Sequence, residues 1–324
     1  MNKLLITIPL IALIVSSCSF NTSSGGNTSE DYSSAPSEES SSSALSSEES
    51  SSQSNTSQSS NYLDDYRLFW EDEFLGTSLS DNWETQIGDG TNYNVYRWGN
   101  NEEQYYKSEN ATVSDGLLHI TAKKERTSYT YNNETRTYEY TSARLRTTGK
   151  ITTTYGYIEA RIKLPAGTGL WPAFWMLPES DFQGKWWPTN GEIDIMEAKG
   201  RLLNKYGATI HTGTSNNQDF YKFKEYTFSS TEEDITGFHN YGVVWSTEGF
   251  TFYIDGESFF TVTPYQYQNS NGLYAGSSTA PFDCPFHILL NLAIGGNYDG
   301  GLSPDENFTE AEMLVDYVRI YHKK

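Results

Sequence analysis

The sequence contains very little cysteine and few positive charges. Only Cys18 and Cys284 occur among 324 residues, which excludes a zinc site built from several cysteines. Lys and Arg together number 22 against 42 Asp and Glu, giving a formal net charge of −20. A chain this negative repels polyanions, so nucleic acids and sulfated polysaccharides are disfavoured as ligands, whereas neutral ligands remain compatible.

The apolar stretch near the N-terminus is too short to cross a bilayer as a permanent helix. It runs from Leu4 to Val15, follows Lys3, and gives way to small residues, as in a secretory signal. Val15-Ser16-Ser17-Cys18 resembles the lipobox of bacterial lipoproteins. The resemblance implies a signal peptide over 1–17, acylation of Cys18, and lipid anchoring of the protein to a bacterial membrane, extracellular or at the cell surface.

An ordinary cleaved signal with an incidental cysteine is the alternative. If Cys18 carries lipid, no intramolecular disulfide can form, because Cys284 has no other partner. We therefore expect Cys284 to be a small buried apolar residue.

Residues 21–60 have too few apolar side chains to form a core. Of these 40 residues 19 are Ser, six are acidic and none is Lys or Arg. Such a segment cannot offset its chain entropy by burial, so we predict a disordered tether over 18–61 and a folded domain over 62–324. Residues 61–324 still carry 36 acidic against 21 basic side chains, a net charge of −15.

The folded part shows no convincing helix longer than two turns. Alternation of apolar and polar residues predicts strands over 116–124, 155–165, 191–198, 240–246, 249–257, 286–294 and 313–322. Asp255-Gly256 predicts a hairpin turn, and 231–239 is the best candidate for a short helix. With neither a repeat nor a second linker, the pattern predicts one all-β sandwich of two antiparallel sheets.

Tyr and Trp are abundant, with 24 and 8 residues. Five tryptophans flank loops rich in Asn and Gly, where a purely structural Trp is less expected: Trp98, Trp171, Trp175, Trp186 and Trp187. Flat aromatic faces suit the apolar faces of pyranose rings. The composition therefore favours a glycan-binding cleft, with core packing as the alternative for each residue.

Three carboxylates, Glu192, Asp194 and Glu197, lie close together in GEIDIMEA. In a regular strand Glu197 points away from the other two, and one extra residue near Ile195-Met196, a β-bulge, would return it to their face. The outer Cα atoms would then lie roughly 13 Å apart. Two inward-leaning Glu side chains could reach the ~5–5.5 Å carboxyl separation of a retaining glycosidase.

In that arrangement the charge of Asp194 would help keep the catalytic acid protonated. Two other interpretations remain open for the same residues. One is a solvated strand face with Ile193 and Ile195 inward. The other is a calcium cluster, although side chains along one strand do not wrap an ion as a loop does.

Five blocks of sequence carry a resemblance that covers residues 66–322. In chain order they are RWGNNEEQYY (97–106), LPAGTGLWPAFWMLP (164–178), GEIDIMEAKG (191–200), NLAIGG (291–296) and VDYVRIY (315–321). Together they resemble the laminarinase branch of glycoside hydrolase family 16, in which the E-x-D-x-x-E spacing is the bulged form. The resemblance implies a β-jelly-roll with a cleft along its concave sheet, and endo-hydrolysis of β-1,3-glucan with retention.

The resemblance also assigns roles to individual residues. Glu192 matches the nucleophile, Glu197 the acid/base, and Asp194 the residue that orients and tunes them. The candidates for sugar binding in the cleft are Trp171 and Trp175, which have the same parity in a strand, so that Phe174 and Met176 would lie in the core. Trp98, Asn100 and Arg144 match donor-side positions. His211, near the acid/base, and Asn291 are further candidates.

Two departures from the family pattern concern the cleft. Tyr298 stands where family members often have Trp, and the segment 179–190 looks extended. The family often carries a structural calcium ion, for which WEDEF (70–74), Gly116 and Asp316 are the matching positions, with Glu73 preferred to Asp72 and a plain surface acid cluster as the alternative. No cofactor is implied for catalysis, and we expect a monomer.

The sequence thus favours a lipid-anchored extracellular endo-β-1,3-glucanase with β-glucan as its substrate partner. An enzyme acting on mixed-linkage β-1,3/1,4-glucan or on galactan is the nearest alternative, because specificity depends on loops. A glycan-binding surface protein without turnover and a structural envelope lipoprotein are the other classes. The complete carboxylate triad favours an enzyme, since a protein that only binds does not need it.

Overall fold

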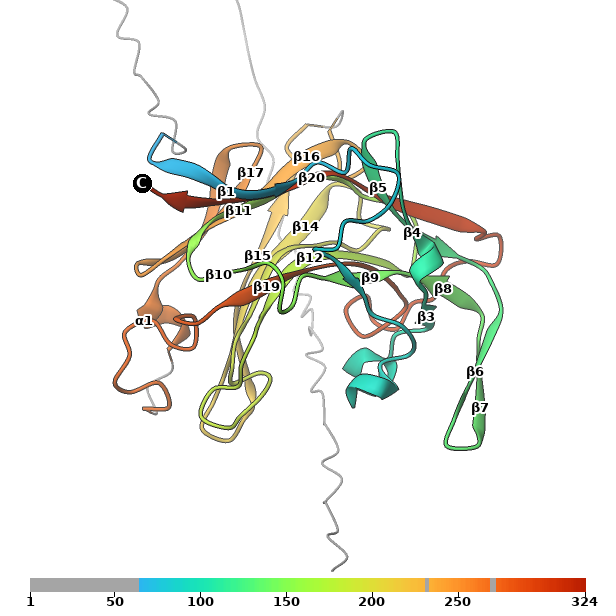
Figure 1. The fold of residues 1–324 in the computed structure, drawn as a ribbon, viewed down its shortest axis with the longest axis horizontal. Helices are drawn as coiled ribbons and strands as arrows, with labels where there is room; N and C mark the ends of the chain where they lie inside the picture. Colours follow the sequence, from blue (N-terminus) through green and yellow to red (C-terminus); the bar gives the residue numbers. More distant parts are fainter. Residues whose placement is uncertain (1–63, 231–232, 269–271) are drawn as a thin grey trace, which may run out of the picture. The chain divides into compact units, whose positions relative to one another are not determined.

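The computed structural model describes residues 64–230, 233–268 and 272–324, all within one compact unit. Two large β-sheets, largely antiparallel, stack face to face, with a two-stranded hairpin beside them (Figure 1). The predicted all-β sandwich is confirmed. The α-helix found in the described residues is the single turn α1 (Pro264–Tyr267), and none of their helices is long and apolar enough to span a bilayer. The predicted signal segment, Cys18 and the tether lie outside the described residues.

The first sheet has ten strands. Its main path, in spatial order, is β18 (Glu257–Val262), β17 (Gly249–Ile254), β16 (Phe238–Ser246), β11 (Gly156–Lys163), β20 (Glu310–Lys323), β5 (Leu117–Lys123), β8 (Tyr140–Ser142) and β3 (Gln104–Tyr106). Two strands lie off this path, β1 (Tyr66–Asp72) on β20 and β4 (Ala111–Ser114) on β5.

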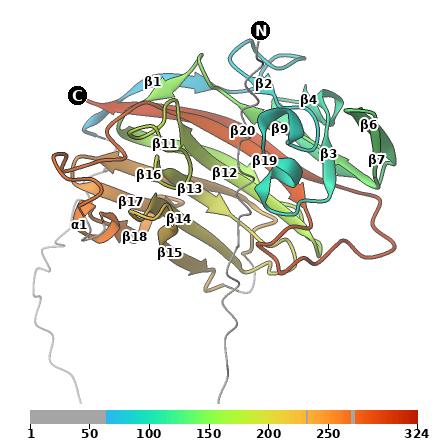
Figure 2. The same cartoon turned by 90° about the horizontal axis from the view of Figure 1, so that it is seen from below.

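The second sheet has eight strands and is seen from its own side in Figure 2. Its order is β15 (Asp219–Thr227), β14 (Lys205–Gly213), β13 (Glu192–Glu197), β12 (Leu170–Pro178), β19 (Phe286–Ile294), β9 (Arg144–Arg146) and β2 (Glu84–Thr85), with β10 (Thr152–Thr153) paired to β19. The remaining elements are the hairpin β6 (Thr127–Tyr131) and β7 (Glu134–Tyr138), and the 3-10 turns η1 (Thr91–Tyr93), η2 (Tyr96–Gly99) and η3 (Ser108–Asn110).

All seven predicted strands are present, and the predicted hairpin turn at Asp255-Gly256 joins β17 to β18. The predicted short helix is wrong for its described part, because 233–237 form an irregular turn before β16 begins. The side chain of Asp234 accepts hydrogen bonds from the backbone N–H and hydroxyl of Thr236, which closes the chain into a local turn.

The core fills the space between the two sheets and is made of the inward-facing apolar side chains of both. All nine residues of β19 are buried, and β11, β12 and β13 each contribute fully buried side chains, among them Ile158, Ile162, Phe174, Met176 and Ile193. Burying each such side chain stabilises the fold by about 1.5–3 kcal/mol. Cys284, predicted to be buried, is half-buried and packs against the edge of this core, because it lies in the loop before β19.

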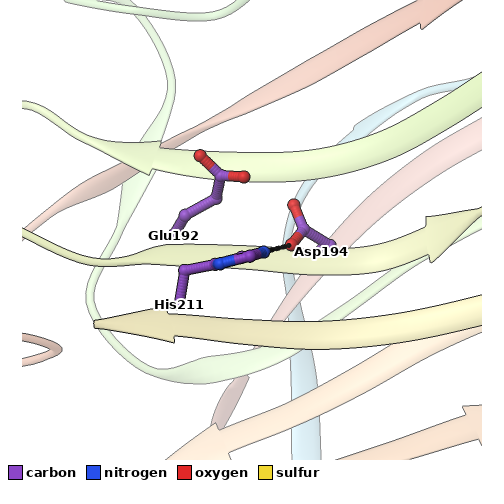
Figure 3. Close-up of side chains that lie close together, drawn as sticks. All are labelled: Glu192, Asp194 and His211. Carbon is purple, nitrogen blue, oxygen red and sulfur yellow. Dashed lines mark ion pairs between the residues drawn. The ribbon is translucent and has the colours of Figure 1, made fainter. Parts of the chain in front are cut away.

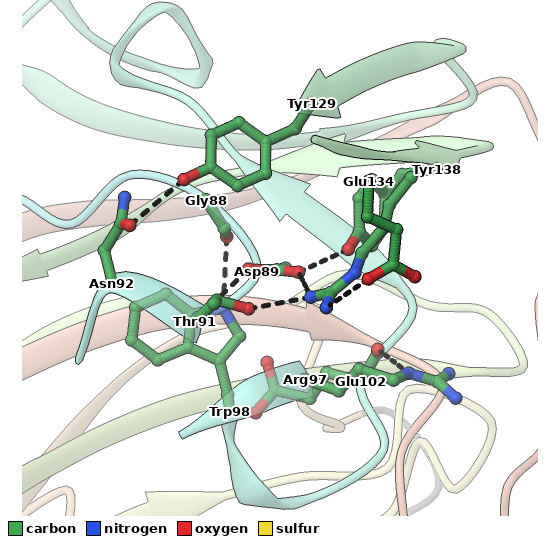
Figure 4. A network of polar contacts seen from close by, with 11 residues as sticks. Gly88, Asp89, Thr91, Asn92, Arg97, Trp98, Glu102, Tyr129, Glu134 and Tyr138 are labelled. Atoms are coloured by element: carbon green, nitrogen blue, oxygen red, sulfur yellow. Dashed lines mark hydrogen bonds and ion pairs between the residues drawn. The ribbon is translucent and has the colours of Figure 1, made fainter. Parts of the chain in front are cut away.

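A buried carboxylate fastens the β6–β7 hairpin to the loop before η1 (Figure 4). Asp89 accepts hydrogen bonds from the Tyr138 hydroxyl, from Arg136 at 3.1 Å and from the Thr91 N–H at 3.0 Å. Burial raises the pKa of Asp89, but these donors outweigh it, so the pKa lies below its usual value. The hairpin is thereby held beside the segment that carries Trp98.

Candidate active site

The β-bulge predicted in β13 is present and sets the geometry of the site. The pairing register to β14 shifts between Asp194 and Glu197, where Ile195 and Met196 take the place of one residue. Both of these side chains are buried in the core. Core packing therefore holds the extra residue in place, and Glu197 returns to the face that carries Glu192 and Asp194.

The three carboxylates share an environment that favours protonation. Asp194 is buried, while Glu192 and Glu197 are half-buried. Burial, and next the negative charge of Asp194, raise the pKa of Glu192 well above its usual value and that of Glu197 to about 8. The Trp171 indole N–H donates to Glu197 Oε1 at 3.0 Å, which orients this carboxyl and acts against part of the rise.

His211 lies between Asp194, which is drawn with it in Figure 3, and Asp219. Its Nε2 is 3.3 Å from Asp194 Oδ2, and its Nδ1 is 2.9 Å from Asp219 Oδ1. Burial lowers the pKa of His211, but the hydrogen bonds and charges of the neighbouring acids raise it more, so its pKa lies well above the usual value. We expected His211 near Glu197, but the strand register places it opposite Glu192.

Arg144 and His211 lie near Glu192 and oppose part of the rise in its pKa. Arg144 is buried, which lowers its pKa, and the negative charge of Glu192 works in the opposite direction. His211 likewise lowers the pKa of Glu192. Glu197 has the Trp171 indole beside it and Lys199 at longer range. The two Glu residues thus have different polar neighbours, with Arg144 near Glu192 and the Trp171 indole on Glu197, while His211 acts on both.

Two of the predicted donor-side residues, Arg144 and Trp98, are in contact with each other, and Arg144 also contacts Trp175. The Arg144 guanidinium lies 4.6 Å from the ring centroids of both Trp98 and Trp175, and its Nε donates to Gln86 at 2.6 Å. The Trp175 indole donates to Asn291 Oδ1 at 2.7 Å. Trp98 and Asn291 are themselves buried, so of the two tryptophans Trp175 has the more accessible ring.

Tyr298 and Asn100, both singled out in the sequence, lie near Trp171. Its ring stacks on Tyr298 at 5.0 Å, and the Tyr298 hydroxyl donates to the Glu197 carbonyl at 3.3 Å. Gly296, at φ +83°, lets the backbone approach: a Cβ there would lie 3.1 Å from the Trp171 ring and 3.2 Å from the Asn100 carbonyl. Tyr298 therefore contacts both the Trp171 ring and the backbone of β13 at Glu197.

Phe174 and Met176 are fully buried, as predicted from the parity of β12. The paired tryptophans of segment 179–190 are both exposed, Trp186 more than Trp187. The Trp187 ring centroid is 6.0 Å from that of His211, which brings this tryptophan to the carboxylate face.

Sequence reasoning missed the strand β15, which brings Asp219, Tyr221 and Phe223 to this face. Only the middle of this strand, Tyr221-Lys222-Phe223-Lys224, alternates aromatic and basic residues, which is a short signal. Tyr221 and Phe223 are both exposed, and Asp219 contacts His211 as described above.

The predicted calcium positions come to one region but have other partners. Glu73 follows β1 and Gly116 precedes β5, and both strands pair with β20, which carries Asp316. Glu73 accepts a hydrogen bond from Arg319 at 2.7 Å, and Asp316 forms an ion pair with Arg161 at 2.5 Å. As placed, these residues do not fit a calcium ion, because it would have to displace both guanidinium groups. Structural calcium stays a prediction, for which thermal unfolding with and without CaCl₂ is the measurement.

The folded part of the chain, which carries the three carboxylates of β13, is similar to known proteins. The family model described as "Beta-porphyranase A-D, GH16 domain" matches residues 69–323. The chain belongs to glycoside hydrolase family 16. Over 262 residues it is 38% identical to glucan endo-1,3-beta-glucosidase A1 of Niallia circulans, covering 79% of this chain and 38% of that protein. Over 271 residues it is 36% identical to the beta-glucanase of Rhodothermus marinus, covering 82% and 88%.

Among solved structures, the endo-beta-1,3-glucanase of Pyrococcus furiosus is similar to this member of family 16. The two share 38% sequence identity and a TM-score of 0.70, and the match covers 80% of this chain and 95% of the other. The family resemblance stated from the five sequence blocks is therefore confirmed.

Proposed function

We propose that this protein is an endo-acting β-1,3-glucanase that hydrolyses laminarin-like polysaccharide with retention of configuration. The observation that carries the proposal is the bulged strand β13, on which three carboxylates share one face with different neighbours. The names of the Niallia and Pyrococcus relatives support β-1,3-glucan as the substrate class.

In the first step the carboxylate of Glu192 bonds to the anomeric carbon as the glycosidic C–O bond breaks, and Glu197 gives its proton to the leaving oxygen. In the second step Glu197 takes a proton from water, whose oxygen attacks the same carbon and releases Glu192. Two inversions give retention, and one water is consumed. Asp194 keeps Glu197 protonated before the first step, and the Trp171 indole fixes the direction of its carboxyl.

A β-porphyran hydrolase is the second candidate, because the matching family model is described by that activity. The net charge of −15 over residues 61–324 makes this candidate weaker if the substrate is sulfated, since like charges repel. Mixed-linkage β-1,3/1,4-glucan remains the alternative within the glucans.

The test is incubation of the purified protein with laminarin, mixed-linkage β-glucan, lichenan and porphyran, following new reducing ends and product sizes. We expect rapid release of short β-1,3-oligosaccharides from laminarin and none from a Glu192→Gln variant. Cleavage of porphyran alone would establish the second candidate, and cleavage of mixed-linkage glucan alone would replace the substrate class. Tight binding of a glycan without turnover would indicate a binding protein.

We further propose that the enzyme acts at the cell surface as a monomer, tethered by lipid on Cys18. The support is the sequence Val15-Ser16-Ser17-Cys18 and the Ser-rich segment that follows it. When the full chain is expressed in a bacterium, Cys18→Ser should move the protein from the detergent phase to the aqueous phase on partitioning. Aqueous partitioning of the wild-type chain would contradict the anchor.

A further inference from the structure

Two exposed aromatic side chains lie on β15, the edge strand of the eight-stranded sheet. Tyr221 is 54% exposed and Phe223 46% exposed, although both are large apolar groups. They are two residues apart, so in a strand they share one face. Neighbouring exposed aromatics of this kind mark binding surfaces more often than isolated ones do.

Their contacts place both rings on the face that carries the catalytic carboxylates. The Tyr221 ring centroid is 5.7 Å from that of His211. A Cβ on Gly207 would lie 2.5 Å from the Phe223 ring and 3.1 Å from the Tyr298 hydroxyl, so Phe223 covers this glycine and approaches Tyr298. Gly207 is the residue that pairs with Glu197.

The pairing registers align these rings with the catalytic strand. Glu192 pairs with His211, which pairs with Tyr221. In the same way Asp194 pairs with Thr209, which pairs with Phe223. Strands lie about 4.8 Å apart, so β15 lies roughly 10 Å from β13 across the sheet. A polysaccharide that crosses the strands at the carboxylates would reach these two rings.

The strand order shows which end of the polysaccharide would reach them. Arg144, which the resemblance to family 16 assigns to the donor side, lies on β9, beyond β12 and β19 from β13, whereas β14 and β15 lie on the other side of β13. The leaving group departs away from the donor side, so β15 lies on the leaving-group side.

We propose that Tyr221 and Phe223 form a stacking site for sugars on the leaving-group side. These sugars lie beyond the sugar unit that carries the leaving oxygen protonated by Glu197. The inference rests on the proposed glycoside hydrolysis and extends it to the acceptor end of the chain. Pyranose rings present apolar C–H faces to aromatic rings, and the edge of the sheet leaves both rings accessible from solvent. The same site would bind an incoming acceptor sugar in the second step.

The test compares Tyr221→Ala, Phe223→Ala and the double variant with the wild-type protein on two substrates. One is the polysaccharide that the wild type cleaves, and the other is an aryl glycoside of the same donor sugars, which has no sugar on the leaving-group side. For the double variant we expect kcat/KM to fall about tenfold on the polysaccharide and to stay unchanged on the aryl glycoside. Transfer to an added oligosaccharide acceptor should fall in parallel.

Phe69→Ala is the matched control, because Phe69 is 52% exposed and lies on β1 of the other sheet. Equal losses on both substrates, or no loss on either, would overturn the proposal. A wild-type dimer that dissociates in the double variant would assign the surface to a second copy of the chain. Which polysaccharide the wild type cleaves tests the proposed function separately, since the stacking site is judged only by the ratio of variant to wild type.

Discussion

Glu197→Ala should lower kcat on laminarin by about 10²–10⁴-fold, the usual contribution of a general acid. For an aryl glycoside whose leaving group needs no proton, the rate of the first step should fall less than it does on laminarin. Glycosyl-enzyme would then accumulate, because no base activates water. Added azide needs no base, so it should restore turnover and give a β-glycosyl azide, identified by NMR of the product.

Glu192→Ala should behave differently, because the side chain that forms the covalent bond is missing. We expect loss of turnover on both substrates, without restoration of a retaining reaction by azide. A β-glycosyl azide from this variant, and none from Glu197→Ala, would exchange the two roles. Glu248→Ala, in the exposed turn between β16 and β17, is the control, and circular dichroism should show all three variants folded.

The dependence of kcat/KM on pH should have an alkaline limb near pH 8. Burial and the charge of Asp194 raise the pKa of Glu197 to about 8, so the catalytic acid stays protonated at neutral pH. Above that value kcat/KM should fall tenfold for each pH unit, because only the protonated form donates to the leaving oxygen. Initial rates on laminarin at low substrate concentration measure this limb in the free enzyme.

Two matched variants test the cause of that limb. Asp194→Asn removes a negative charge that raises the pKa of Glu197, so the limb should move to lower pH. Asp219→Asn removes a partner of His211, whose positive charge lowers the pKa of Glu197, so the limb should move to higher pH. Shifts in the same direction for both variants, or no shift for either, would refute this electrostatic picture.

The bulge could be predicted from the sequence because a strand has a rigid two-residue period. Glu197 has the wrong parity for the face of Glu192, and one extra residue is the simplest way to correct it. The resemblance to family 16 then supplied the roles. The short helix predicted over 231–239 was wrong at 233–237, because the side chain of Asp234 closes a turn there that helix propensity does not reveal.

The position of His211 and the presence of β15 could not be predicted because both depend on pairing between distant segments. Whether His211 lies opposite Glu192 or Glu197 depends on a register that no single strand contains. As an edge strand, β15 exposes residues on both faces, so its apolar alternation is weak. The stacking of Tyr298 on Trp171 is likewise a contact between residues far apart in the chain.

The bulge couples substitutions in the core to the geometry of the catalytic carboxylates. Ile195 and Met196 are interior side chains, yet their packing fixes the direction of Glu197 on the opposite face of the strand. A change of volume at either position would shift the acid relative to the nucleophile as well as destabilise the core. Variation in the deep interior would thus be constrained by the chemistry as well as by stability, and the two selective pressures would be difficult to separate at these two positions.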